Sequence, residues 1–126
     1  MHITIKRLTL KDLYKLQAIV NKDIAHWANI EWPFNRVAAT NFILNYNTWG
    51  IYINNGILAG AVEVKSDCET AYFVAEQYQG IGIATAAVKQ CIDIFGDRQL
   101  WCVVNPNNHA SLRVAQKAKL RIKFIN

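Results

Sequence analysis

The sequence has no hydrophobic run of the roughly 20 residues that a membrane-spanning helix needs. Charged residues interrupt the first 13 positions, so we expect no apolar core of a secretory signal there. The composition, with 52% hydrophobic and 18% charged residues, excludes a disordered chain. We therefore expect one folded domain over residues 1–126, cytoplasmic and without membrane contact.

Cysteine is scarce, and positive charge is not concentrated. The three cysteines, Cys68, Cys91 and Cys102, lie far apart, a spacing that suits reduced thiols better than a disulfide framework or a zinc site, so we expect no metal. The net charge of +5 is spread along the chain, so no basic stripe for nucleic acid is indicated. The excess favours anionic ligands such as phosphates, or a plain solvated surface.

Hydrophobic periodicity predicts the order β-α-α-β-β-β-α-β-α-β. Asn54, Asn55 and Gly56 mark a hairpin turn, and Pro33 breaks an irregular aromatic segment over 24–34. Strands are predicted over 2–9, 49–53, 57–65, 69–75, 99–104 and 120–125, and helices over 10–23, 35–46, 81–95 and 108–118. The pattern indicates an α/β (α+β) fold in which helices cover a mixed, mostly antiparallel sheet.

A glycine turn joins the predicted strand 69–75 to the next helix. Gly80 and Gly82 let backbone N–H groups approach an anion at a helix N-terminus. A P-loop is excluded because Ile83 follows the second glycine instead of Lys. A Rossmann turn is disfavoured because Thr85 stands where a third glycine belongs. The turn therefore predicts either a diphosphate-binding site of a different class or a purely structural bend.

A second segment, "VNPNNHASLRVAQKA" (104–118), opens the last predicted helix with Asn108 and Ser111. With Gln79-x-x-Gly82-x-Ala84 in the turn, it resembles the GNAT superfamily of N-acetyltransferases. The pattern N-x-A-S-x-R-V-x-x-K is similar to the branch that acetylates ribosomal-protein N-termini. An N-terminal cap alone would also explain Asn108.

The resemblance implies a sheet with splayed central strands and acetyl-CoA as cosubstrate. The pantetheine arm would run along Phe73, Val74 and Ala75 in the gap between strands. Asn108 and Ser111 stand in the family's second CoA segment and would also bind the cofactor. The diphosphate would lie on the turn, whose implied contact residues are Gln79, Gly80, Ile81, Gly82, Ile83, Ala84 and Thr85.

The resemblance also implies direct attack of a primary amine on the thioester, which requires a base and an oxyanion donor. Glu69 fits the base position best, followed by Glu63 and then Glu76. The Val74 N–H would stabilise the oxyanion. Cys102 is expected to be a buried structural thiol rather than an acyl carrier.

The leaving thiolate has no obvious proton donor, since Ala115 stands where many relatives have a tyrosine. Ser111 would serve as in the ribosomal-protein-type branch, with Tyr72 or Tyr78 as alternatives. The implied acceptor pocket contains Trp27, Trp32 and Phe34, for a protein N-terminus or a small amine; a satellite hydrophobic cluster is the competing interpretation.

Two departures from the family bear on assembly and activity. Lys119 and Leu120 stand at the family's Gly-Phe positions, and the family's final strand is missing, as in a C-terminally truncated member. An open sheet edge predicts a homodimer. The alternative function is a non-catalytic CoA- or acyl-CoA-binding sensor module. A structural or nucleic-acid-binding domain without CoA is the third hypothesis.

Overall fold

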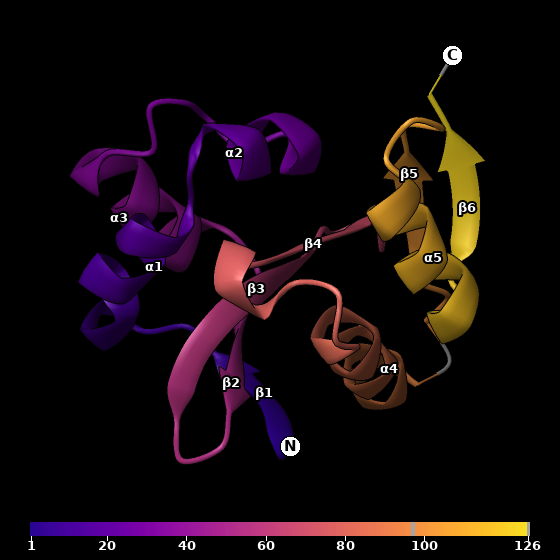
Figure 1. The fold of residues 1–126 in the computed structure, drawn as a ribbon, viewed down its shortest axis with the longest axis horizontal. Coiled ribbons are helices and arrows are strands. Elements are labelled where there is room, and N and C mark those ends of the chain that lie inside the picture. The colour runs from indigo at the N-terminus through magenta and orange to yellow at the C-terminus, as the bar shows by residue number, and fades with distance from the viewer. Residues whose placement is uncertain (97, 126) are drawn as a thin grey trace.

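The computed structural model describes residues 1–96 and 98–125, and Figure 1 shows their fold. Its strands are β1 (Ile3–Arg7), β2 (Thr48–Ile53), β3 (Ile57–Val64), β4 (Thr70–Val74), β5 (Trp101–Val104) and β6 (Arg121–Phe124). Its helices are η1 (Leu10–Asp12), α1 (Leu13–Ile19), α2 (Lys22–Ala28), α3 (Arg36–Asn45), η2 (Glu76–Tyr78), α4 (Ile83–Phe95) and α5 (His109–Ala118).

The strands form two hydrogen-bonded groups rather than one continuous sheet. β1 to β4 pair antiparallel in sequence order, and β5 pairs parallel with β6. Among the residues that the structure describes, a single bridge, from Glu69 to Trp101, joins the two groups where β4 and β5 begin. Beyond that bridge the two strands separate, which confirms the predicted splayed centre and the mixed α/β fold.

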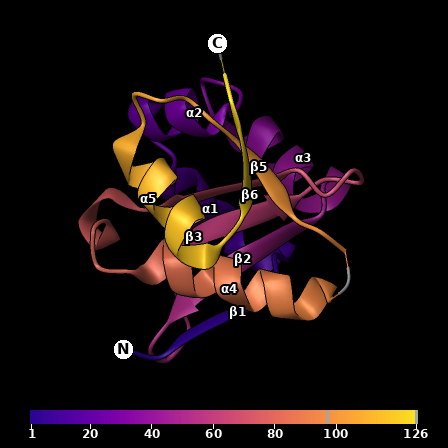
Figure 2. The same ribbon diagram turned by 90° about the vertical axis from the view of Figure 1, so that its right-hand side faces the viewer.

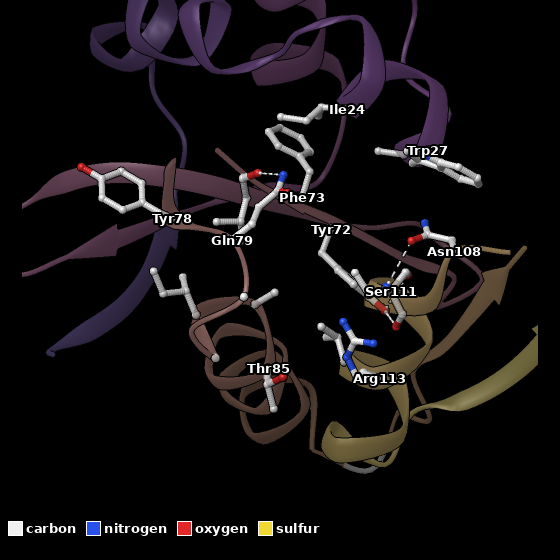
Figure 3. Close-up of a pocket in the computed structure, with 18 of the residues that line it drawn as sticks. Ile24, Trp27, Tyr72, Phe73, Tyr78, Gln79, Thr85, Asn108, Ser111 and Arg113 are labelled. Atoms are coloured by element: carbon white, nitrogen blue, oxygen red, sulfur yellow. Dashed lines mark hydrogen bonds between the residues drawn. The ribbon is translucent and has the colours of Figure 1, made fainter. Parts of the chain in front are cut away.

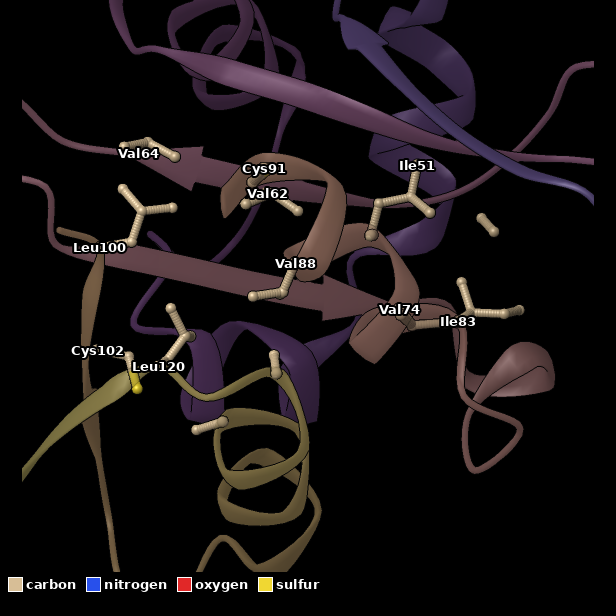
Figure 4. Close-up of a cluster of buried hydrophobic side chains, with 14 of the residues drawn as sticks. Ile51, Val62, Val64, Val74, Ile83, Val88, Cys91, Leu100, Cys102 and Leu120 are labelled. Carbon is tan, nitrogen blue, oxygen red and sulfur yellow. The ribbon is translucent and has the colours of Figure 1, made fainter. Parts of the chain in front are cut away.

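Helices cover both faces of the four-stranded sheet. In Figures 1 and 2, α1, α2 and α3 lie on one side of it and α4 on the other, with α5 beside β5 and β6. One hydrophobic cluster fills the α1–α3 side, around Leu16, Phe42 and Phe73. The second cluster joins the sheet to α4 and α5; Figure 4 shows Val62, Val88 and other members. These two cores fix β4 and α4, which border the gap.

The predicted helix 10–23 is wrong, because the chain breaks at Val20 and Asn21. Val20 is extended, and the Asn21 side chain accepts a hydrogen bond from the Ile24 N–H at 2.8 Å, which caps a new helix, α2. Residues 22–28 are therefore helical, and the predicted irregular segment 24–34 is reduced to residues 29–34. The helix ends at Asn29 in the left-handed region.

The remaining helix ends follow from local chemistry. Asn35 caps α3 by accepting the Ala38 N–H at 2.9 Å. Lys119 ends α5 in the left-handed region at φ 62°, a conformation that glycine adopts at less cost. Among residues 1–96 and 98–125, none of the helices is long and apolar enough to span a bilayer.

Candidate active site

A cavity of about 450 Å³ opens where β4 and β5 separate. Four parts of the chain surround it: α2, the C-terminal half of β4, the glycine turn with the start of α4, and one side of α5 (Figure 3). Most of the predicted cofactor residues line it: Phe73, Val74, Gln79, Gly80, Gly82, Ile83, Ala84, Thr85, Asn108 and Ser111. Ile81 does not line it, and its side chain is 58% exposed.

The backbone geometry of the glycine turn suits an anion-binding site. Gly80 and Gly82 adopt φ 78° and 87°, values that side-chain-bearing residues rarely take. A Cβ added at either position would meet nothing within 4 Å, so the turn faces open space. Gly82 caps α4, and the Ala86 N–H makes the first helical bond, to the Gly82 carbonyl. The preceding N–H groups of α4 are therefore left to a ligand.

Gln79 contacts the neighbouring strand rather than pointing freely into the turn. Its side-chain amide donates to the Val74 carbonyl at 3.0 Å. This bond ties the end of β4 to the glycine turn, since the two residues flank η2. Gln79 retains a second amide N–H for a ligand.

The edge of β4 presents backbone groups to the gap. The Ala75 N–H donates to the Ala59 carbonyl at 2.7 Å, and Gly60 lies opposite Val74. Because antiparallel ladders alternate, the backbone groups of Val74 and Tyr72 point away from β3. Those of Phe73 point toward β3, so only the Phe73 side chain faces the cavity. This corrects the predicted pantetheine contact at the Phe73 backbone.

The opposite wall is the first turn of α5. Asn108 caps this helix, its side-chain oxygen accepting the Ser111 N–H at 3.2 Å. Tyr72 crosses from β4: its hydroxyl donates to the Ser111 carbonyl at 2.8 Å, and the Ser111 hydroxyl donates to the Tyr72 oxygen at 3.1 Å. Figure 3 shows Tyr72 pointing at Ser111. Ser111 is thus held in place beside the gap.

Burial controls the two ionisable groups next to this wall. It raises the pKa of Tyr72 to about 12, against which the hydrogen bond from Ser111 acts more weakly. Burial, with a smaller effect of the Glu69 charge, raises the pKa of the Cys102 thiol to about 11. Both groups are protonated at neutral pH. Cys102 therefore lacks the thiolate that an acyl carrier needs.

The predicted bases do not line the cavity. Glu69 lies at the closed end of the gap, with its carboxylate 3.4 Å from the Lys65 ammonium. Glu63 is half-buried on β3, and burial raises its pKa, with Lys65 opposing and Glu69 adding to the shift. Glu76 is exposed on η2. The structure gives none of the three direct access to the cavity.

Of the three predicted acceptor residues, one lines the cavity and two do not. Trp27 lines the cavity, with a side chain 46% exposed and His26 packed edge-on against it at 4.8 Å. Trp32 is exposed and does not line it. Phe34 is buried in the hydrophobic cluster on the α1–α3 side, with its ring centroid 6.1 Å from that of Phe42, so it belongs to the core. Phe34 is thereby corrected from a predicted acceptor contact to a core residue.

Three lining residues carry charge, and sequence reasoning assigned a role to none of them: Asp23, Arg113 and Lys117. Arg113 and Lys117 lie one turn apart on α5. The sequence signal that could have identified these two residues was their place in the N-x-A-S-x-R-V-x-x-K pattern. Asp23 had no such signal, because it lies where α2 starts unexpectedly.

Comparison with known proteins identifies the family of the chain. Residues 2–121 match the family model described as the acetyltransferase (GNAT) domain. The chain therefore belongs to the GNAT family.

Solved structures share the fold over nearly the whole chain. An acetyltransferase of the GNAT family from Bacillus anthracis superposes with a TM-score of 0.77 at 20% identity, over 94% of this chain and 79% of that one. The spermidine N-acetyltransferase from Vibrio cholerae, solved with CoA and spermine, gives 0.76 at 17% identity, over 92% and 79%. At these identities the likeness establishes the fold alone.

One curated relative shares a shorter stretch. The uncharacterized protein YkkB of Bacillus subtilis (strain 168) is 35% identical over 66 residues. The alignment spans 49% of this chain and 38% of the length of that protein.

Proposed function

We propose that this protein is an acetyl-CoA-dependent N-acetyltransferase that acts on a primary amine. One observation carries the proposal: a single cavity joins the N-terminus of α4, with two positive-φ glycines, to the free edge of β4. A diphosphate would fit the N-terminus of α4, and the amide-bearing pantetheine arm would fit the free edge of β4. Family membership and the CoA-bound neighbour from Vibrio cholerae support the same cosubstrate.

Acetyl-CoA would be held by three sets of groups. The N–H groups of Ile83, Ala84 and Thr85 at the start of α4 would take the diphosphate. Arg113 and Lys117, the cations that line the cavity from α5, would neutralise phosphate charge. Tyr72 and Val74 would offer backbone groups to the pantetheine arm. The bound arm would replace the hydrogen bond from the Gln79 amide to the Val74 carbonyl.

The reaction would run by direct attack in a ternary complex. The neutral amine attacks the thioester carbonyl, and the carbonyl oxygen becomes an oxyanion that the Val74 N–H stabilises. The C–S bond then breaks, and the CoA thiolate takes a proton from Ser111 or water. A Ser111 oxygen that gives up its proton regains one from solvent. Tyr72 holds the Ser111 hydroxyl and, with a pKa near 12, stays a hydrogen-bond donor throughout.

Proton removal from the amine would use Glu69 through water. Glu69 precedes Phe73 by four residues, a distance of about 13 Å along an extended strand. The Glu69 carboxylate therefore cannot contact the reacting amine directly. The side chains of Glu69 and Phe73 point to the same face of the sheet, which carries the acceptor side of the cavity.

Two finer assignments belong to the proposal. The pattern from Asn108 to Lys117 supports the ribosomal-protein-type branch, and hence a peptide N-terminus as one acceptor class. The spermine-bound neighbour supports a small amine as the other class. A homodimer and a cytoplasmic location are proposed on the sequence alone.

A turnover assay tests the function. The purified protein is incubated with acetyl-CoA and amines of both classes, and the released thiol and the acetylated amine are measured together. Stoichiometric formation of both supports the enzyme. Tight acetyl-CoA binding without transfer to any amine would favour the non-catalytic sensor instead.

A further inference from the structure

The cavity has charge of opposite sign at its two ends. Asp23, on α2, is the one carboxylate among the described residues that line it, whereas Arg113 and Lys117 line it from α5. Figure 3 shows Trp27 of α2 on one side of β4 and Arg113 with Thr85 on the other. An anionic cosubstrate is drawn to the α4–α5 end and repelled by Asp23. The α2 end is therefore left to the acceptor.

α2 presents a carboxylate and an aromatic ring to this end together. Asp23 and Trp27 are four residues apart, one turn of the helix, and both line the cavity. The ring of Trp27 is 46% exposed, and the ion pairs of residues 1–96 and 98–125 leave Asp23 without a basic partner. Ile24 and Ala25, both buried, fix the helix against the core. A carboxylate beside an accessible indole suits an organic cation.

We propose that Asp23 and Trp27 form a cation subsite and that the acceptor is a di- or polyamine. This inference rests on the proposed function. The ammonium that Asp23 holds stays protonated, and a protonated amine cannot attack a carbonyl. The amine that receives the acetyl group is therefore a second one, placed near Val74, and the acceptor carries a positive charge separate from its reacting group.

The position of Asp23 also has a purely structural explanation. An acidic residue in the first helical turn stabilises the helix dipole, and Asp23 is in the first turn of α2. That role changes stability but does not distinguish one amine from another. Selectivity between acceptors therefore separates the two roles.

The test compares two acceptors with the same carbon chain, 1,4-diaminobutane and 4-amino-1-butanol. For each variant, the ratio of the kcat/KM values for the two acceptors is measured. We expect Asp23→Asn to lower this ratio about fivefold, as the loss of one partly exposed ion pair implies. Trp27→Leu should also lower it, and Trp27→Phe should lower it less, because phenylalanine keeps a ring face. Added salt should lower the wild-type ratio.

Asp93→Asn is the matched control, since Asp93 is exposed on α4 and does not line the cavity. It should leave the ratio at the wild-type value. A ratio that Asp23→Asn leaves unchanged overturns the subsite, even if both amines are acetylated.

Binding of 1,4-diaminobutane to the CoA complex, by calorimetry, covers the case in which neither amine is acetylated. Binding that Asp23→Asn weakens supports the subsite while the transferase function fails. Absence of diamine binding to the CoA complex overturns the subsite.

Discussion

The hydroxyl of Tyr72 on β4 donates a hydrogen bond to the Ser111 carbonyl on α5, and the Ser111 hydroxyl donates back to the same phenol oxygen. This reciprocal pair connects the two sides of the gap that the cosubstrate would occupy. β4 and β5 are otherwise bridged only at Glu69 and Trp101 within the described residues. Tyr72 therefore sets the position of α5 relative to β4.

Replacing Tyr72 with Phe removes both hydrogen bonds and keeps the ring. At about 1 kcal/mol for each bond, we expect a loss of about 2 kcal/mol in the free energy of unfolding, measured by urea denaturation. Tyr14→Phe, at an exposed tyrosine, is the control and should change little. Equal stability of Tyr72→Phe and wild type would show that the pair does not hold α5.

Alkaline pH should weaken the protein through the same residue. The pKa of Tyr72 is raised from 10.0 to about 12 in the folded state, so folding favours the neutral phenol. Its contribution is complete below pH 10 and is lost as the pH rises toward 12. The difference of about 2 kcal/mol in unfolding free energy between wild type and Tyr72→Phe should shrink over this window and be largely lost near pH 12. A constant difference from pH 8 to about pH 12 would contradict the assignment.

Gly60 allows close approach of β3 to β4 beside the cavity. A Cβ at Gly60 would collide with the Phe73 carbonyl oxygen, which is backbone and cannot move alone. We expect Gly60→Ala to cost about 1–3 kcal/mol of stability and to weaken acetyl-CoA binding. At Gly50 the added Cβ meets only the ring end of Tyr52. Gly50→Ala should cost less, and the reverse order would refute this explanation.

Glu69→Gln tests the proposed base. We expect kcat to fall by about a hundredfold or more, with acetyl-CoA affinity retained, as general-base catalysis implies. Glu76→Gln, an exposed carboxylate on η2, is the matched control and should keep full activity. The kcat of Glu69→Gln should approach that of wild type as the pH rises from 7 to about 10, because the amine deprotonates on its own at high pH. A kcat that Glu69→Gln leaves intact would assign proton removal to water alone.

Cysteine labelling tests the direct mechanism. Cys91 and Cys102 are buried with raised pKa values of about 12 and 11, whereas Cys68 is partly exposed. A maleimide should therefore label Cys68 in the native protein and the other two only after unfolding. An acetyl group trapped on Cys102 during turnover, detected by mass spectrometry, would replace direct attack by an acyl-enzyme.

Much of the fold, and the backbone geometry of the proposed cofactor end of the cavity, could be predicted from local sequence. Gly80, Gly82, Asn35 and Asn108 act through their own backbone and side-chain chemistry, which short patterns record. The strand and helix order was also predictable, except for one break. Asn21 marked that break as a cap, but the apolar spacing across 10–23 concealed it.

The acceptor end depended on tertiary packing and was less predictable. Phe34 and Trp27 look alike in sequence, yet one is buried beside Phe42 and the other lines the cavity. Asp23 lines the cavity because α2 packs against β4, and the local sequence does not indicate that contact. No periodic pattern encodes which face of a short helix meets a strand that is distant in sequence.

Calorimetric titration of acetyl-CoA into wild type and into Gly82→Asp tests the central claim most directly. The substituted carboxylate would stand in the seat proposed for the diphosphate, at a position where a Cβ meets open space. Because φ 87° strains any side chain, Gly82→Asn serves as the neutral control of similar shape. The account predicts micromolar binding by wild type, weaker binding by Gly82→Asn and none by Gly82→Asp. Equal binding by all three proteins would show that the turn holds no diphosphate.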